Sequence, residues 1–188
     1  MKRIALTGGI GAGKSYVCRI LAEKGIAVYD CDAAAKRLMR QSAELREALT
    51  RLVGDEVYDG DCLQKAVLAR FLLASEANNR AVNDIVHPAV AVDIAASQAQ
   101  WIECAILFES GFIHRISVDA VVCVSAPVDI RVERIVRRDA LTPARAMQWI
   151  RRQMPQEQVE ALSDYVIQND GTADVRTQIS QIIKKIYQ

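Results

Sequence analysis

Short apolar runs alternate along the chain with longer segments whose apolar residues recur every three or four positions. The short runs are apolar at consecutive positions, which is typical of strands that are covered on both faces of a parallel sheet. The longer segments have the spacing of helices that bury one face. The expected strands are residues 3–7, 26–29, 101–108, 120–124 and 165–167. This alternation predicts an α/β fold in which helices flank a five-stranded parallel sheet.

Helices are predicted after the first strand, after the second strand and at the end of the chain. Residues 15–24 carry Val17, Ile20 and Leu21 on one face, and a further helix is expected to begin at Asp32. The terminal segment has one apolar face, made by Val175, Ile179, Ile182, Ile183 and Ile186. From about residue 42 to 100 the rhythm of strand and helix stops and the pattern is mostly helical. We expect this stretch to be a helical insertion that faces the substrate.

The composition narrows the class of protein without pointing to a particular chemistry. The chain has 188 residues, of which 51% are hydrophobic, and a net charge of +1, so any affinity for phosphate must come from local patches. Its five cysteines have irregular spacing and no CxxC pair, which argues against a disulfide framework or a zinc site. The sequence shows no signal segment and no apolar run of about 18 residues. We therefore expect a cytoplasmic protein with no nucleic-acid or membrane partner. The sequence leaves the oligomeric state open, and a monomer is the favoured state.

The clearest chemical motif follows the first strand. Residues 8–15 read GGIGAGKS and match the phosphate-binding pattern GxxxxGK[ST] at every fixed position. Glycines let backbone N–H groups turn toward phosphate oxygens, and the helix that begins inside the motif adds free N–H donors. Lys14 can reach the β- and γ-phosphates, and the Ser15 hydroxyl can bind Mg²⁺. The alternative is a glycine-rich turn with an accidental lysine, which the flanking strand and helix argue against.

An acidic pair, Asp30 and Asp32, lies where the second strand is expected to end. The carboxyl ends of parallel strands face the ligand crevice. A carboxylate at that place can accept a proton from a substrate hydroxyl and can help to hold a metal ion. Structural alternatives stay open, because Asp32 can be the N-cap of the next helix and Asp30 can be a turn residue.

These two motifs, together with further segments along the chain, resemble the dephospho-CoA kinase family. That family opens with a similar LTGGIGSGKS loop and a D-x-D second strand, and this chain has LTGGIGAGKS at 6–15 and VYDCDAAAK at 28–36. The similarity continues in order over nearly the whole chain. It includes NDIVHP at 83–88, ILFESG at 106–111, Arg134 with RRD at 137–139, RQM at 152–154 and DYVIQNDG at 164–171.

The resemblance implies an activity and a set of site residues. The family transfers the γ-phosphate of ATP to the 3′-hydroxyl of dephospho-CoA, which is the last step of coenzyme A synthesis, with ATP as cosubstrate and Mg²⁺. Asp32 and Lys14 are implied as catalytic residues, with Asp32 as the base, and Ser15 as the metal ligand. The implied ATP-binding residues are Gly9, Gly11, Ala12, Gly13, Lys14, Ser15, Tyr16, Arg138 and Asn169. The implied contacts to dephospho-CoA are Asp32, His87 and Glu109.

Members of the family also have a P-loop core, a helical domain on the CoA side and a mobile lid. Here the whole chain would be a single domain of this type, with a core of about residues 1–41, 101–130 and 161–188. The insertion would take about 42–100 and the lid about 131–160. Residues 131–152 contain seven arginines against two acids, and a basic helical segment can close over a triphosphate and exclude water. We expect one or two of Arg134, Arg137 and Arg138 to contact phosphate, while several other arginines form a solvated face.

Several of the implied residues also have simpler explanations. His87 precedes Pro88, and such a pair often marks the boundary of a helix. Glu109 can cap the next turn, and Asn169 can stabilise a turn with the following Asp-Gly pair instead of approaching adenine. Tyr16 stands where the family commonly has threonine, so local packing will differ while the Ser15 hydroxyl is kept.

Two rival classes of function remain for the experiments. A nucleoside monophosphate kinase would use the same core, but the helical insertion with its His-Pro pair argues against it. A nucleotide-binding module without turnover would need neither the acidic pair nor the arginine-rich segment. A GTPase is disfavoured because the sequence lacks both a DxxG switch sequence and an NKxD guanine reader.

Overall fold

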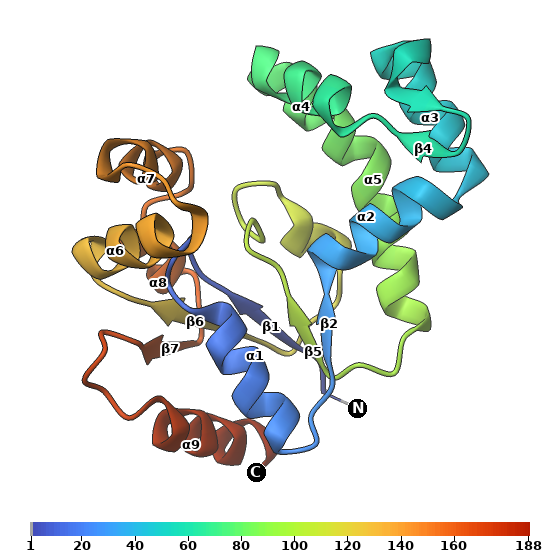
Figure 1. Ribbon diagram of the computed structural model, residues 1–188. Helices are drawn as coiled ribbons and strands as arrows, with labels where there is room; N and C mark the ends of the chain where they lie inside the picture. Colours follow the sequence, from blue (N-terminus) through green and yellow to red (C-terminus); the bar gives the residue numbers. More distant parts are fainter. Residues whose placement is uncertain (1) are drawn as a thin grey trace. The chain divides into compact units, whose positions relative to one another are not determined.

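The computed structural model describes residues 2–188 and has a parallel sheet at its centre. The sheet contains five strands in the order β2-β5-β1-β6-β7 (Figure 1). Its strands are β1 (Ile4–Thr7), β2 (Val28–Asp30), β5 (Trp101–Glu103), β6 (Ala120–Ser125) and β7 (Tyr165–Gln168). The α/β class and the five-stranded parallel sheet expected from the sequence are confirmed.

Strand β1 lies in the middle of the sheet and fixes the register on both sides. Its residue Ile4 lies opposite Trp101 of β5 and Ala120 of β6, and both pairings are parallel. All four residues of β1 and all six of β6 are buried. This explains why the sequence shows continuous apolar runs here, since a strand covered on both faces has no exposed side that would favour polar residues.

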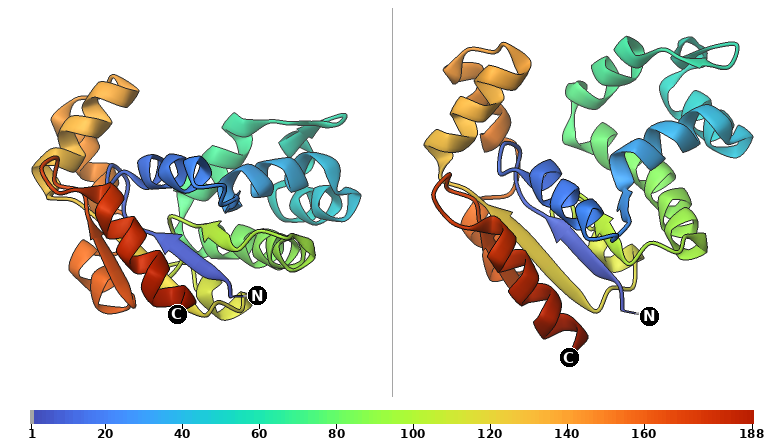
Figure 2. Two further views of the ribbon diagram at one scale, coloured as in Figure 1. Left: turned by 90° about the horizontal axis from the view of Figure 1, so that it is seen from below. Right: turned by 60° about the horizontal axis from the view of Figure 1, so that its bottom comes forward.

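One face of the sheet is covered by two helices that lie side by side, α1 (Lys14–Glu23) and α9 (Val175–Tyr187) (Figures 1 and 2). Helix α1 brings Val17, Ile20 and Leu21 into the core against alternate residues of the central strands. The α9 residues that share this core are Val175, Ile179, Ile182 and Ile186. The spacing of these residues predicted both helices correctly.

The remaining helices of the sheet-containing part follow β6 along the chain. They are α6 (Val128–Asp139), α7 (Pro143–Arg151) and α8 (Gln156–Ala161). A short 3-10 helix, η2 (Phe112–Arg115), precedes β6 in the sequence. Helix α8 packs against β6, where its first residue, Gln156, donates a hydrogen bond to the buried Cys123. Because Cys123 alternates with the β6 residues that face α1 and α9, α8 covers the opposite face of the sheet.

The third strand is shorter than the sequence suggested. We expected residues 101–108, but β5 ends at Glu103. Cys104 still donates its N–H to Leu6, and the chain then forms local turn bonds, such as the N–H of Gly111 to the carbonyl of Phe108. Leu107 is completely buried inside this turn. Its burial, and not a place in the sheet, accounts for the apolar character that made the segment look like a strand.

The chain divides into two compact units. One unit consists of Met1–Tyr29, Ala99–Ile113 and Ser117–Gln188, and the other of Asp30–Gln98 with His114–Ile116. The second unit holds the helical insertion, whose expected start was about residue 42, together with the acidic pair. Its elements are α2 (Cys31–Gln41), α3 (Ala43–Val53), η1 (Asp55–Val57), β3 (Tyr58–Asp59), β4 (Cys62–Leu63), α4 (Lys65–Ala74) and α5 (Glu76–Ala96).

Helix α5 organises the second unit, because α2, α3 and α4 all pack against it. Its buried residues Val82, Val86, Val90 and Ile94 recur every four positions and form the face that these helices cover. Pro88 lies in the interior of α5, so the His87-Pro88 pair does not mark a helix boundary. A proline costs the helix one backbone hydrogen bond, and the packing on both sides of Pro88 keeps the helix continuous.

We predict that Ile179→Ala lowers the free energy of unfolding by about 2–5 kcal/mol, because it removes a buried side chain from the core and leaves a cavity. Urea denaturation followed by circular dichroism measures the change. The control is Lys185→Ala, an exposed position on the same helix, which should change the free energy of unfolding by less than about 0.5 kcal/mol. Equal effects of the two substitutions would contradict the packing of α9 described above.

Candidate functional site

The phosphate loop joins the end of β1 to the start of α1, as its motif requires. Thr7 ends the strand, Lys14 begins the helix, and Gly13 between them has a φ of 101°, in the left-handed region that favours glycine. A Cβ on Gly13 would lie 2.1 Å from the side-chain nitrogen of Asn169, so this position has no room for a larger residue. The local sequence therefore forces both the turn and the free N–H groups at the start of α1.

Lys14 folds back over its own loop. Its Nζ donates a hydrogen bond of 2.8 Å to the carbonyl of Gly8 and lies 3.7 Å from a carboxylate oxygen of Glu103. The side chains of Lys14 and Glu103 are only 12% and 17% exposed. The ammonium group is thus held at the loop in a partly desolvated place, where its attraction for phosphate is stronger than in water.

Glu103 is a site residue that the sequence analysis missed. It is the last residue of β5, so it lies at the carboxyl end of a central strand, where ligands bind in parallel sheets. Glu109 was expected at this edge because the strand was predicted to continue to residue 108. With the strand ending at residue 103, Glu103 is the acidic residue at its carboxyl end.

Two arginines of α6 hold the loop from a second direction. Arg131 is 3% exposed, and its Nε donates to the carbonyl of Ile10 at 2.9 Å. Burial lowers the pKa of this guanidinium from its ordinary value. Arg134 lies one turn later on the same face and donates to the carbonyls of Gly11 and Ala12 at 3.3 and 3.2 Å. Both arginines therefore bind carbonyls of the loop, and Arg131 also donates to the side chain of Gln156 at 3.4 Å.

Two glutamines accept hydrogen bonds from N–H groups of the same loop. The N–H of Ile10 donates to the side chain of Gln153 at 2.6 Å, and that of Gly9 donates to the side chain of Gln156 at 3.4 Å. Gln153 lies between α7 and α8, and Gln156 begins α8. No local pattern indicates these contacts, because each glutamine is more than 140 residues away from its partner.

Asn169 closes the loop on the side of β7. It is buried, its Nδ2 donates to the carbonyl of Ala12 at 2.8 Å, and its carbonyl accepts from Arg134 at 2.9 Å. The following Asp170 accepts from the N–H groups of Thr172 and Ala173, and these bonds hold the pKa of its carboxyl below the ordinary value. Asn169 thus braces the phosphate loop, while Asp170 stabilises the turn.

The two carboxylates of the acidic pair have different surroundings, because Asp30 is bound to the helix that follows and Asp32 is exposed. Asp30 is the N-cap of α2, since its carboxylate accepts the N–H of Ala33 at 2.9 Å. The alternative that Asp32 caps this helix is therefore wrong. Asp32 lies in the first turn of α2 with its side chain 82% exposed, 3.2 Å from the Nζ of Lys36. Its carboxylate remains accessible to a substrate.

The other predicted contact residues differ in their surroundings. His87 is buried on α5, and burial lowers the pKa of its imidazole, an effect that Arg115 reinforces and Asp84 opposes. Glu109 is an exposed residue whose pKa is raised by partial desolvation, against the opposing effects of its own N–H, the N–H of Met154 and the charge of Lys14. Arg138 is exposed and forms an ion pair of 2.7 Å with Asp139.

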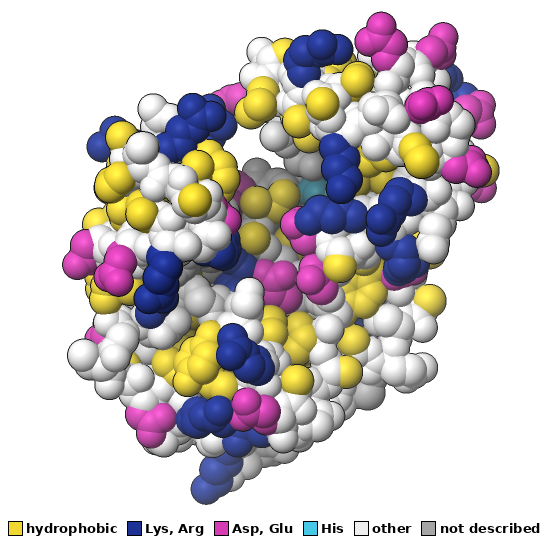
Figure 3. Space-filling view, viewed as in Figure 1, with side chains coloured by type: hydrophobic (Ala, Val, Ile, Leu, Met, Phe, Trp, Pro, Cys, Tyr) yellow, Lys and Arg dark blue, Asp and Glu magenta, His cyan; other side chains and the backbone are white. Residues whose placement is uncertain are grey.

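The structure therefore brings most of the implied nucleotide residues together within the first unit, while Asp32 and His87 belong to the second. On the face drawn in Figure 3, basic and acidic side chains are interspersed. Within residues 2–188, no three His, Cys, Asp or Glu side chains are grouped so that they could hold a metal ion by themselves, and no helix is long and apolar enough to span a membrane.

Comparisons with known proteins agree with this site. A family model described as dephospho-CoA kinase matches residues 2–174. A dephospho-CoA kinase of Bacteroides fragilis is 40% identical and covers 99% of this chain and 93% of its own length. A dephospho-CoA kinase of Chlorobium chlorochromatii is 37% identical, with 91% and 86% covered.

Solved structures show the same arrangement of elements. A crystal structure of a protein from Thermus thermophilus has a TM-score of 0.82 at 28% identity and covers 98% of this chain and 96% of that chain. A dephospho-CoA kinase from Campylobacter jejuni has a TM-score of 0.66 at 22% identity, with 99% and 98% covered, and shares the fold.

We predict that Arg131→Met raises the Kd for ATP roughly ten- to hundredfold, because a hydrogen bond to a charged group contributes about 1.5–3 kcal/mol and the loop loses one here. Methionine keeps most of the buried volume, so the loss reports on the bond. Isothermal titration calorimetry measures the Kd. The control is Arg145→Met, at an exposed arginine of α7, which should leave ATP binding unchanged. Unchanged binding by the Arg131 variant would show that the loop holds its conformation without this side chain.

Proposed function

The chain belongs to the dephospho-CoA kinase family, and we propose that it transfers the γ-phosphate of ATP to the 3′-hydroxyl of dephospho-CoA, which completes coenzyme A biosynthesis. The observation that carries the proposal is the position of Lys14, held between the carbonyl of Gly8 and the carboxylate of Glu103 at a complete phosphate loop. Phosphoryl transfer needs little covalent chemistry from a protein, so positioning and charge stabilisation account for most of the catalysis.

For ATP, the N–H groups of the loop and of the first turn of α1 would surround the phosphates, and Lys14 would neutralise the charge that develops on the transferred group. Gly9, Gly11, Ala12, Gly13 and Tyr16 would contribute through the backbone of this segment. Arg138 would approach the phosphates from α6, which requires its guanidinium to leave Asp139. Asn169 would act mainly by holding Ala12 in place.

The residues at the loop fit a magnesium ion, which prefers oxygen ligands and keeps several waters. Ser15 is exposed at the start of α1 and offers its hydroxyl, and Glu103 offers a carboxylate at the neighbouring strand end. We propose that Ser15 binds the ion directly and that Glu103 supports it, either directly or through water. The ion, when bound, would supply positive charge that offsets the negative charge of the phosphates.

For the acceptor, Asp32 would take the proton from the 3′-hydroxyl as the hydroxyl oxygen forms its bond to the γ-phosphorus. The bond from that phosphorus to the bridging oxygen of ADP breaks in the same step. The exposed carboxylate at the start of α2 is suited to this role because no backbone N–H of the helix occupies it in the described structure, whereas Asp30 is engaged as the cap. His87 and Glu109 would contribute to binding dephospho-CoA.

The setting of the reaction is also a proposal. We place the enzyme in the cytoplasm, where ATP is available and where its five free cysteines would stay reduced. We propose that it acts as a monomer, which light scattering of the purified protein would test.

We predict that Asp32→Asn lowers kcat about 10²–10⁴-fold, since asparagine cannot take up the proton, while the Kd for ATP stays the same. The assay follows the gain of one phosphate on dephospho-CoA by mass spectrometry, with ATP and Mg²⁺ present. The matched control is Glu44→Gln, an exposed acid in the first turn of α3, which should keep the full rate.

Two results would count against the assignment at different levels. A wild-type rate in the Asp32 variant would remove Asp32 as the base but leave the substrate in place. A wild-type protein that binds ATP yet leaves dephospho-CoA unchanged, and phosphorylates a nucleoside monophosphate instead, would overturn the acceptor.

A further inference from the structure

The order of the strands gives the direction in which a triphosphate would lie on the loop. Lys14, which reaches the β- and γ-phosphates in loops of this type, points to Glu103 on β5. Asn169 and Arg134 hold the opposite side of the loop, next to β7. Because β5 and β7 lie on opposite sides of β1, the γ-phosphate faces β5 and the nucleoside leaves the loop on the side of β7 and α9.

Tyr16 stands on that nucleoside side. It is the third residue of α1 and the residue is 38% exposed, although a large aromatic side chain gains by being covered. Arg19, one turn later on the same helix, places its guanidinium 5.9 Å from the centre of the ring. Arg19 therefore lies over one face of the aromatic ring, while part of the residue stays exposed.

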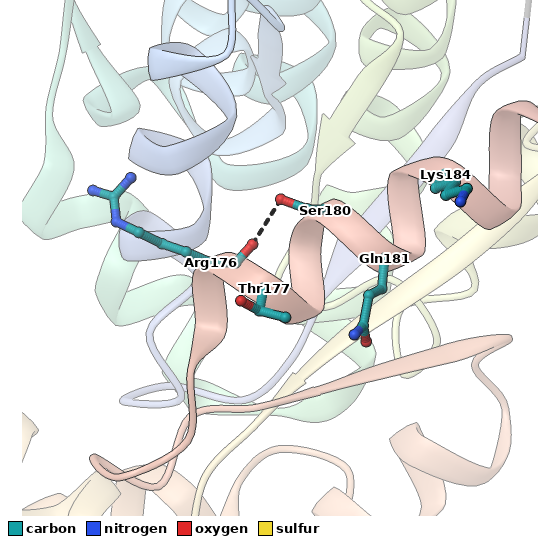
Figure 4. Close-up of a pocket in the computed structure, with 5 residues that line it drawn as sticks. All are labelled: Arg176, Thr177, Ser180, Gln181 and Lys184. Atoms are coloured by element: carbon teal, nitrogen blue, oxygen red, sulfur yellow. Dashed lines mark hydrogen bonds between the residues drawn. The ribbon is translucent and has the colours of Figure 1, made fainter.

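A second arginine reaches the same place from α9. The side chain of Arg176 extends away from the start of α9 (Figure 4). Its guanidinium donates to Glu23 at the end of α1 at 2.6 Å. The pKa of Arg176 is raised first by Glu23 and, more weakly, by the hydroxyl of Tyr16. The contacts on both helices therefore place Tyr16 beside the start of α9.

We propose that the ring of Tyr16 is a contact for the nucleoside part of ATP, with the exposed side of the ring against the ribose and adenine. This inference rests on the proposed function, because it assumes that ATP occupies the loop. An aromatic ring can stack on any base, so the contact adds affinity without strong selection among nucleobases.

The test compares ligands with and without a nucleoside. Titration calorimetry measures the Kd of ATP and of inorganic tripolyphosphate, each with Mg²⁺, for the wild-type protein, Tyr16→Thr and Tyr16→Phe. We expect Tyr16→Thr to raise the Kd of ATP about tenfold and to leave the Kd of tripolyphosphate within about twofold. A tenfold change corresponds to about 1.36 kcal/mol, which lies within the usual contribution of a ring that stacks on a base. Tyr16→Phe keeps the ring and should bind both ligands like the wild type.

Other outcomes overturn the proposal. If Tyr16→Thr weakens ATP and tripolyphosphate equally, the ring supports the phosphate loop and does not touch the nucleoside. If neither Kd changes, or if Tyr16→Phe loses as much affinity for ATP as Tyr16→Thr, the stacking contact is wrong. Failure of the proposed function would be seen separately, as a wild-type protein that binds ATP but does not phosphorylate dephospho-CoA.

Discussion

The phosphate loop depends on side chains that lie far from it in the sequence. A glycine-rich loop with free N–H groups has many conformations in isolation, and fixing each residue costs conformational entropy. Arg131 and Arg134 fix its carbonyls, and Gln153 and Gln156 fix two of its N–H groups. The loop is therefore held from outside before any ligand arrives, which reduces the ordering that nucleotide binding must supply.

The same contacts join the sheet to the segment expected to act as a lid. Gln156 bonds to the buried Cys123 of β6 as well as to the loop, so the start of α8 is anchored on the core. Burial raises the pKa of the Cys123 thiol to about 11, which keeps it protonated. Its neutral sulfur accepts the hydrogen bond from the side-chain N–H of Gln156. Movement of α6, of α8 or of the connection before α8 would change the loop directly, because Arg131 and Arg134 lie on α6, Gln153 on that connection and Gln156 on α8.

The parts of this account that the sequence could predict are the local ones. The phosphate loop is a motif of consecutive residues, so it can be identified directly. The apolar faces of α1 and α9 follow from the spacing of their hydrophobic residues. Glu103 was missed because the buried turn after β5 is as apolar as a strand, so the end of the strand was placed too late. The roles of Arg131, Gln153 and Gln156 depend on tertiary contacts across more than 120 residues, and nothing in their neighbours along the chain reveals them.

These side chains order the loop in the absence of nucleotide. Amide hydrogen exchange of Ile10, measured by NMR on the nucleotide-free protein, tests this ordering. We predict that this amide is protected in the wild type, because it donates to Gln153, and that Gln153→Ala speeds its exchange by about tenfold, the effect of losing roughly 1.4 kcal/mol. An Ile10 amide that exchanges freely in the wild-type protein, or at the same rate in both proteins, would contradict the account.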